Sequence, residues 1–360
     1  MVAADARRLT SNPKSEIRNP KSSEPPYVGS YNLLNPFRRR GGGGNWLFVL
    51  CCLFANVALG VEKPTATPAR PAKPPVREIN RKAEPLKIAF ISYANPQQVV
   101  KDSEAIAEYL EPRLGVPVKG FVTLDYGSSI EAMRSGKADV AFVDPLAFMM
   151  AHEQFGAKPI LLEVYAGGPR YHSCIWVRKD SGLRDLKDLR GKKIAFADQV
   201  DMSGHLLPRD TFGQSGLFEG DRMGSKFFKQ VYFAGGDEQA MRALFNGFVD
   251  AAGVSQYAIN LLQPDEQRQI VSVAQSIESP SHLAMVRPGL EAVTVDRLKQ
   301  ALLALDKHDS GDRALLSRLY GVGGYVEAEL TDFADVAKVA ARYGFVKKPE
   351  AFSVRSAQSR

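Results

Sequence analysis

From residue 86 onward the chain alternates short apolar runs with stretches of helical spacing, which restricts the possible folds more than any other feature. Apolar runs of roughly four to eight residues predict buried strands, and apolar side chains every three or four residues predict helices. Strands are predicted at 86–91, 116–122, 138–143, 159–165, 173–177, 193–196, 230–233, 249–254, 269–274 and 282–286. Helices are predicted at 96–114, 128–134, 145–152, 186–189, 204–212, 238–246, 295–305, 312–319 and 332–343. This order indicates an α/β fold with mostly parallel sheets.

The alternation occurs as two series, the second of which begins with the predicted helix at 186–189. The phrases Gly136-Lys137-Ala138-Asp139-Val140-Ala141 and Gly247-Phe248-Val249-Asp250-Ala251-Ala252 each lead from a helix through a glycine turn into a buried strand. We therefore expect two lobes built on a similar plan. A length of 360 residues suits two domains of ordinary size.

The amino-terminal region has the features of an export signal. Arg38-Arg39-Arg40 and a glycine run precede an apolar segment at 46–55, and Ala58-Leu59-Gly60 forms a small-x-small cleavage site. This order predicts a signal peptide at 38–60 that is cleaved near Gly60. The apolar segment is shorter than the ~20 residues of a spanning helix. We expect a periplasmic or otherwise extracytoplasmic protein, and an uncleaved leader that anchors the chain is the alternative.

Three further segments lie outside the alternating region. Residues 1–37 are polar and repeat Asn-Pro-Lys-Ser, so we expect disorder there and interpret them as lying upstream of the true start within a 1–60 leader. Residues 61–85 contain six prolines, which predict an extended tether. Residues 346–360 are predicted to form a flexible tail.

The charge distribution and the cysteines narrow the classes of function. Residues 1–60 hold eight of the 47 Lys and Arg residues and three of the 40 Asp and Glu residues, so most of the net charge of +7 lies in the leader. The rest of the chain lacks a basic stripe interleaved with aromatic residues, and we expect no nucleic-acid partner. Without the leader only Cys174 remains, and a single thiol forms no internal disulfide.

Sequence signatures of catalysis and of metal binding are missing. The sequence contains no His-x-x-x-His or Glu-x-x-His pair with the spacing of metal ligands. No phosphate-loop or dinucleotide fingerprint follows a predicted strand. Asp201, Ser203 and His205 are too close in sequence to favour the geometry of a catalytic triad. We therefore expect no enzymatic activity, no cofactor and no metal. An extracytoplasmic enzyme that uses Asp201, Asp237 and His282 as acid–base groups is the alternative.

Several loops that follow predicted strands also open predicted helices, namely 126–129, 144–146, 198–204 and 234–237. In open α/β sheets ligands bind beyond the carboxyl ends of the strands. Helix starts offer free N–H donors and the positive end of a dipole, which suit oxyanions. We expect Ser128 or Ser129 to cap one of these helices and Ser203 to cap another. The loops together predict a shared anion-binding cleft.

The order of these motifs resembles a known family, the periplasmic phosphonate-binding proteins of ABC transporters, with their phosphite- and phosphate-binding relatives. The resemblance spans about 85–345 and rests on 124–134, 136–144, Tyr171 with 177–181, and 198–208. The last stretch is similar to the family's Asp-Pro-x-Ser-Thr-Ser-Gly-x-Leu-x-Pro loop, which it matches at the positions of Asp198, Ser203, Gly204, Leu206 and Pro208.

The resemblance implies a type II periplasmic-binding-protein fold, a two-lobed clamshell with two crossover segments. Lobe one would comprise 86–178 and 283–345, and lobe two would comprise 179–282. The strands at 173–177 and 282–286 would then be the crossovers. Closure of the lobes around a ligand is a hinge motion.

The family's binding residues carry over only in part. Asp201 and Met202 stand where the family has Ser-Thr hydroxyls, Gly236 stands where phosphonate binders have a His, and Tyr257 and His282 replace carboxylates that hold an amine. The ligand-binding residues that we predict are Tyr126, Ser128, Tyr171, Asp201, Ser203, Gly204, Gly236, Asp237 and His282. A charged Asp201 ~4 Å from an anion would cost about 4 kcal/mol at an effective dielectric near 20. Arg170 and His172 are candidates to compensate this charge.

The resemblance implies a non-enzymatic receptor that delivers a small, oxyanionic ligand to the permease of an ABC transporter. We expect a monomer that contacts the membrane only through the permease or through an uncleaved leader. A ligand sensor of the same fold that serves a signalling partner is the alternative.

Overall fold

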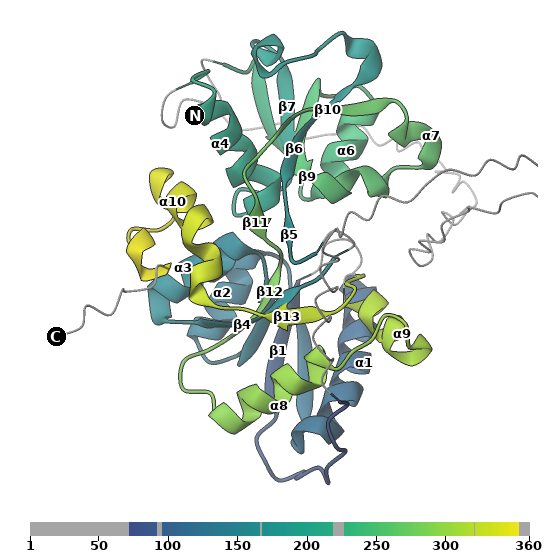
Figure 1. Ribbon diagram of the computed structural model, residues 1–360, viewed down its shortest axis with the longest axis vertical. Helices are drawn as coiled ribbons and strands as arrows, with labels where there is room; N and C mark the ends of the chain where they lie inside the picture. Colours follow the sequence, from purple (N-terminus) through teal and green to yellow (C-terminus); the bar gives the residue numbers. More distant parts are fainter. Residues whose placement is uncertain (1–71, 92–95, 166–167, 219–226, 320, 353–360) are drawn as a thin grey trace, which may run out of the picture. The chain divides into compact units, whose positions relative to one another are not determined.

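The computed structural model describes residues 72–91, 96–165, 168–218, 227–319 and 321–352 (Figure 1). The predicted signal peptide and residues 61–71 of the predicted tether lie outside these residues. Among the helices described here, none is both long and apolar enough to cross a membrane.

The first lobe is built on a six-stranded sheet in the order β13-β4-β12-β3-β1-β2. Its strands are β1 (Leu86–Ile91), β2 (Val118–Thr123), β3 (Val140–Val143), β4 (Lys158–Glu163), β12 (Leu283–Val286) and β13 (Tyr325–Glu327). One face is covered by α1 (Pro96–Leu114), α8 (Ala292–Leu303) and α9 (Ser310–Arg318). The other face is covered by α2 (Tyr126–Arg134), α3 (Pro145–Phe155) and α10 (Ala334–Arg342). Alternate residues of β1 enter the two cores, as the strand period of two requires.

The second lobe is built on a five-stranded sheet in the order β10-β6-β9-β7-β8. Its strands are β6 (Ser173–Arg178), β7 (Lys193–Phe196), β8 (Gln230–Phe233), β9 (Ala251–Ser255) and β10 (Ile270–Gln275). Helix α6 (Asp237–Phe245) packs on one face, and Phe212 of α4 (Leu207–Gln214) packs on the other. Other short elements of this lobe are η1 (Lys179–Ser181), η2 (Leu186–Leu189), η4 (Gln256–Leu261) and α7 (Pro264–Gln267). Two short elements of the first lobe are η5 (Leu330–Phe333) and η6 (Pro349–Phe352).

Two short strands connect the sheets. β5 (Arg170–Tyr171) and β11 (Ser279–Pro280) pair with each other in antiparallel fashion between the two lobes (Figure 1). The predicted two-lobed α/β fold with two crossing segments is confirmed. The crossings lie at β5 and β11, however. The strand predicted at 173–177 pairs with β9 and β10 and so belongs to the second sheet, and the strand predicted at 282–286 pairs with β3 and β4 and so belongs to the first.

Both sheets are mixed, which corrects the expectation of mostly parallel sheets. β1 is parallel to β2 and β3, and β7 is parallel to β8 and β9. The strands next to the crossings, β6, β10 and β12, pair antiparallel with their neighbours. β6 and β12, the first sheet strands after the two crossings, run opposite to both of their neighbours, and β13 runs opposite to β4.

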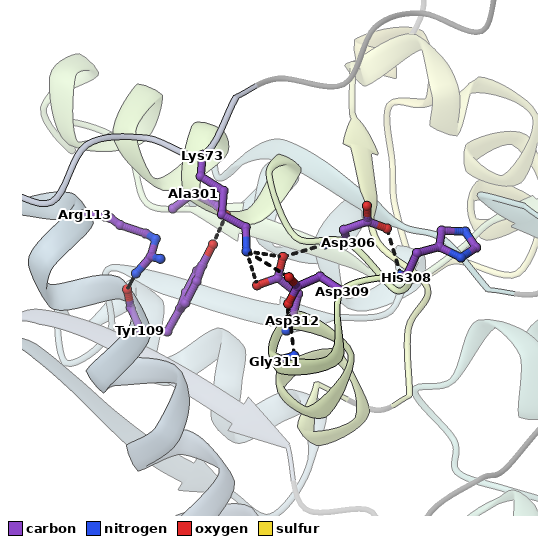
Figure 2. Close-up of polar contacts among 9 residues, drawn as sticks. All are labelled: Lys73, Tyr109, Arg113, Ala301, Asp306, His308, Asp309, Gly311 and Asp312. Atoms are coloured by element: carbon purple, nitrogen blue, oxygen red, sulfur yellow. Dashed lines mark hydrogen bonds and ion pairs between the residues drawn. The ribbon is translucent and has the colours of Figure 1, made fainter.

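Both ends of the described chain pack more closely than the sequence predicts. Val346 and Phe352 are buried in the core of the first lobe, so the part of the predicted tail up to residue 352 is folded. At the other end, the part of the predicted tether from residue 72 contacts the first lobe. Figure 2 shows Lys73 beside Asp309 and Asp312, and its Nζ lies 2.9 Å from Asp312 Oδ2.

Candidate ligand-binding site

The first candidate loop opens α2, and its cap is Asp125 where the sequence predicts Ser128 or Ser129. Asp125 Oδ1 accepts the N–H of Ser128 at 2.6 Å, and its own N–H donates to Ser128 Oγ at 3.2 Å. The two residues form a capping box, in which each side chain satisfies a backbone N–H. Ser128 is therefore an exposed member of this box, and its recorded hydrogen bonds all go to Asp125.

The second loop places a carboxylate between the lobes. Asp144 follows β3 and caps α3 by accepting the N–H of Ala147 at 2.7 Å through Oδ1. Its Oδ2 accepts the N–H of Met202, a residue of the second lobe, at 2.5 Å. Burial raises the pKa of Asp144 to about 7 against the opposing effect of these hydrogen bonds, and the charge of Asp198 raises it further.

The third loop leads from β7 into η3 (Met202–Leu206), which runs directly into α4. The N-cap is Asp201, whereas the sequence predicts Ser203. Asp201 Oδ1 accepts the N–H of Gly204 at 2.7 Å and the hydroxyl of Ser203 at 3.1 Å. Burial raises the pKa of Asp201 well above its ordinary value, and the charges of Asp144 and Asp237 raise it further. The carboxyl group of Asp201 therefore accepts hydrogen bonds from the same N–H and O–H donors that an oxyanion would use at this helix start.

The fourth loop opens α6. Gly236 is the N-cap and has no side chain to cap the helix, and Asp237 is the first helical residue. Burial raises the pKa of Asp237, although the hydroxyl and N–H of Ser255 oppose the change. Within the described ranges, no Lys or Arg forms an ion pair with Asp144, Asp201 or Asp237.

Aromatic side chains from both crossings lie together. Tyr126 Oη and His282 Nε2 are 3.2 Å apart, and the ring of Tyr171 is stacked on His282 with centroids 6.5 Å apart. Burial lowers the pKa of His282 to about 4, so the imidazole is neutral at pH 7. Tyr165 lies against both His282 and Tyr257.

The hydroxyl of Tyr171 is buried without a hydrogen bond of good geometry in the described structure. The pKa of Tyr171 is raised well above its ordinary value, first by burial and then by the charges of Asp144 and Asp201. The hydroxyls of Ser279 and Ser203 lie close enough to oppose this shift. An unsatisfied buried hydroxyl costs free energy, so Tyr171 Oη can still take a partner.

Glu163 is a further buried group that the sequence analysis did not identify. Its Oε2 accepts the hydroxyl of Tyr165 at 2.8 Å, and its Oε1 has no hydrogen-bond partner in the described structure. Burial raises the pKa of Glu163 to about 8. A Glu at the end of the apolar run Ile160-Leu161-Leu162 was the available signal.

The two candidates for charge compensation do not pair with Asp201. Arg170 lies 3.9 Å from Asp332, and His172 Nδ1 contacts the carbonyl of Ser276 at 2.9 Å. Among the described residues, no group of three or more His, Cys, Asp and Glu side chains could hold a metal ion.

The structure thus brings seven of the nine predicted site residues into two connected groups. Asp201, Ser203, Gly204 and Asp237 lie around the start of η3. Tyr171 and His282 lie at the crossings, and Tyr126 of α2 lies beside His282. Tyr171 links the two groups because its ring stacks on His282 and because the charges of Asp144 and Asp201 are close enough to raise its pKa. Gly236 precedes Asp237, and Ser128 is occupied by its capping box.

Comparison with known proteins places this geometry in context. The model of one family, described as "ABC transporter, phosphonate, periplasmic substrate-binding protein", matches residues 88–333. The phosphate-import protein PhnD of Mycolicibacterium smegmatis is 29% identical over 205 residues, which cover 55% of this chain and 60% of that protein. The phosphonates-binding periplasmic protein of Escherichia coli is 27% identical over 242 residues, 65% of this chain and 70% of that protein.

Solved structures agree with the fold. PhnD1 of Prochlorococcus marinus in complex with methylphosphonate superimposes with a TM-score of 0.63 at 18% identity, over 72% of this chain and 98% of that one. XAC2383 of Xanthomonas citri bound to ATP superimposes with a TM-score of 0.61 at 19% identity, over 75% of this chain and 100% of that one. The type II periplasmic-binding-protein fold is confirmed. Because the family model covers more than half of the sequence, the chain belongs to the phosphonate-type periplasmic substrate-binding proteins of ABC transporters.

Proposed function

We propose that this chain is an exported receptor that captures a small oxyanion between its two lobes and delivers it to the permease of an ABC transporter. The ligand would be of the phosphate, phosphite or phosphonate class; the names of the two curated relatives mention phosphate and phosphonates. Tyr126, Tyr171, His282 and the start of η3 would contact it. We expect the protein to act as a monomer.

The observation that supports this proposal most directly is the hydrogen bond from the Met202 N–H to Asp144 Oδ2. A carboxylate of the first lobe here occupies a helix start of the second lobe. An oxyanion at the same helix start would bind the same kind of donor, since helix starts favour negative charge. Tyr171 Oη, which is buried and makes no hydrogen bond of good geometry to the residues that the structure describes, would supply a further donor close by.

A thermal-shift screen tests the function. The panel should contain phosphate, phosphite, methylphosphonate, aminoethylphosphonate, sulfate, simple carboxylates and divalent metals. A ligand at a hundred times its Kd should stabilise the protein by about 2.7 kcal/mol. Tyr171→Phe should reduce the shift for the best anion, while Tyr232→Phe, a change on an exposed position of β8, should leave it unchanged. If no anion raises the melting temperature, the proposed function is wrong.

A further inference from the structure

Asp201 occupies the helix start at which the proposed oxyanion would bind, and the two negative charges conflict. Its Oδ1 is held by Gly204 and Ser203, whereas no hydrogen bond to its Oδ2 is recorded in the described structure. A carboxylate accepts hydrogen bonds only, but a protonated carboxyl group also carries an O–H donor. A protonated Asp201 would therefore supply an O–H donor at the position where the family has the hydroxyl of Ser or Thr.

The surroundings of Asp201 favour the protonated form. The titratable groups that face it are Asp144 at the start of α3, Asp237 at the start of α6 and Tyr171 on β5, and Asp198 lies in its own loop. His282, which stacks on Tyr171, is neutral at pH 7. All of the charged members of this set are acidic, and none of them is compensated by an ion pair with Lys or Arg in the described ranges. Bringing an anion to this place favours proton uptake still more.

A second observation points to a ligand at the same place. Tyr171 is only 4% exposed, and its buried hydroxyl makes no hydrogen bond of good geometry in the described structure. The hydroxyl lies near enough to Asp144 and Asp201 for their charges to raise the pKa of Tyr171. Tyr171 and a protonated Asp201 would together present two O–H donors to one oxyanion. Neither donor is supplied by a basic residue.

We propose that Asp201 holds a proton in the ligand-bound state and donates it through the carboxyl oxygen that the helix start leaves free, so that, at a pH where Asp201 is ionised in the ligand-free protein, each oxyanion captured takes up a proton from solvent. This inference rests on the proposed function. It makes Asp201 a determinant of affinity and of its pH dependence: the ligand should bind more weakly as pH rises.

Isothermal titration calorimetry on the purified protein tests this coupling. Sulfate and methanesulfonate serve as probes because neither changes its own protonation between pH 6 and pH 9, and phosphate is the comparison. Titrations in buffers of different ionisation enthalpy give the number of protons taken up. At alkaline pH we expect about one proton per anion, and a Kd that rises about tenfold per pH unit.

Asp201→Asn keeps an acceptor for Gly204 and offers an N–H donor that does not titrate. We expect its Kd to vary little with pH and its proton uptake to fall to near zero. Asp185→Asn is the matched control, because Asp185 also caps a helix through its side chain but lies at η2. This control should follow the unmodified protein.

The outcomes separate the two proposals. Anion binding at alkaline pH without proton uptake by the unmodified protein overturns the role of Asp201 and leaves the receptor function in place. If Asp201→Asn takes up as many protons per anion as the unmodified protein, the role of Asp201 is again overturned and the receptor function again stands. No anion binding at any pH, or tighter binding of a cation such as choline as pH rises, overturns both. The proton count needs no variant, so the test holds even where Asp201→Asn does not fold.

Discussion

Glu163 allows a quantitative prediction because its environment is simple. Its side chain is fully buried, one oxygen accepts the hydroxyl of Tyr165, and the other has no partner in the described structure. Burial raises its pKa from an ordinary value of 4.5 to about 8. We predict that the free energy of unfolding of the unmodified protein falls steeply as pH rises, and that Glu163→Gln removes this fall.

The direction and the size follow from proton linkage. Below pH 4.5 the carboxyl is protonated in the folded and the unfolded chain, so it makes stability neither rise nor fall with pH. Between pH 4.5 and pH 8 the unfolded chain releases a proton that the folded chain retains, so stability falls as pH rises. Above pH 8 the loss is complete and amounts to about 5 kcal/mol, at about 1.4 kcal/mol per pH unit.

The assay is urea unfolding of both proteins from pH 5 to pH 9. Gln keeps an acceptor for Tyr165, so the two proteins should be within about 1 kcal/mol at pH 5. The variant should be the more stable by several kcal/mol at pH 9. Tyr165→Phe removes the donor to Oε2 and should extend the decline to higher pH, because that hydrogen bond lowers the pKa of Glu163. Parallel pH curves for the unmodified protein and Glu163→Gln would refute the reasoning.

Three further predictions concern other buried positions. Asp144→Asn should flatten the fall in stability between about pH 4 and pH 7 by about 1.4 kcal/mol per pH unit, since the pKa of Asp144 is raised to about 7; urea unfolding at several pH values measures this, and an unchanged slope contradicts it. Phe352→Ala should cost about 3–5 kcal/mol because the ring packs on Phe148 in the first core; a change below about 1 kcal/mol in chemical unfolding would mean that the end of the chain is not packed. Gly204→Ala would collide with Ala197, so we expect a loss of about 1–3 kcal/mol and weaker anion binding, and calorimetry that finds normal binding would contradict this.

The sequence predicts the local elements well because their signals are local. The apolar runs that become β1, β7 and β8 have the same bounds in the prediction and in the structure. The helix caps are less predictable. Asp125 competes with Ser128, and Asp201 competes with Ser203, for the same role within three residues. The carboxylate takes the cap in both cases, and the serine becomes its hydrogen-bond donor.

The assignment of strands to sheets and the contacts across the site depend on pairing between residues far apart in the sequence, which the local pattern does not predict. An apolar run such as Ser173–Arg178 has the same pattern in either sheet, and only its pairing with β9 and β10 assigns it to the second lobe. The contact between Asp144 and Met202 joins residues 58 positions apart. The acidic character of the site arises from such contacts, because Asp144, Asp201 and Asp237 follow three different strands and carry no shared sequence motif.

The docked segment at 72–85 has a mechanical consequence. Lys73 pairs with Asp312 and Asp309 (Figure 2). The Arg77 N–H donates to the carbonyl of Pro112 at 2.6 Å, so this segment is bound to helices of the first lobe. Whatever holds the amino-terminal side of the chain therefore holds the first lobe stationary. In a hinge motion about the crossings at β5 and β11, a chain held at its amino-terminal side would move its second lobe and not its first, so a fluorophore on the exposed Phe248 would change its distance from the held end more than one on the exposed Leu124.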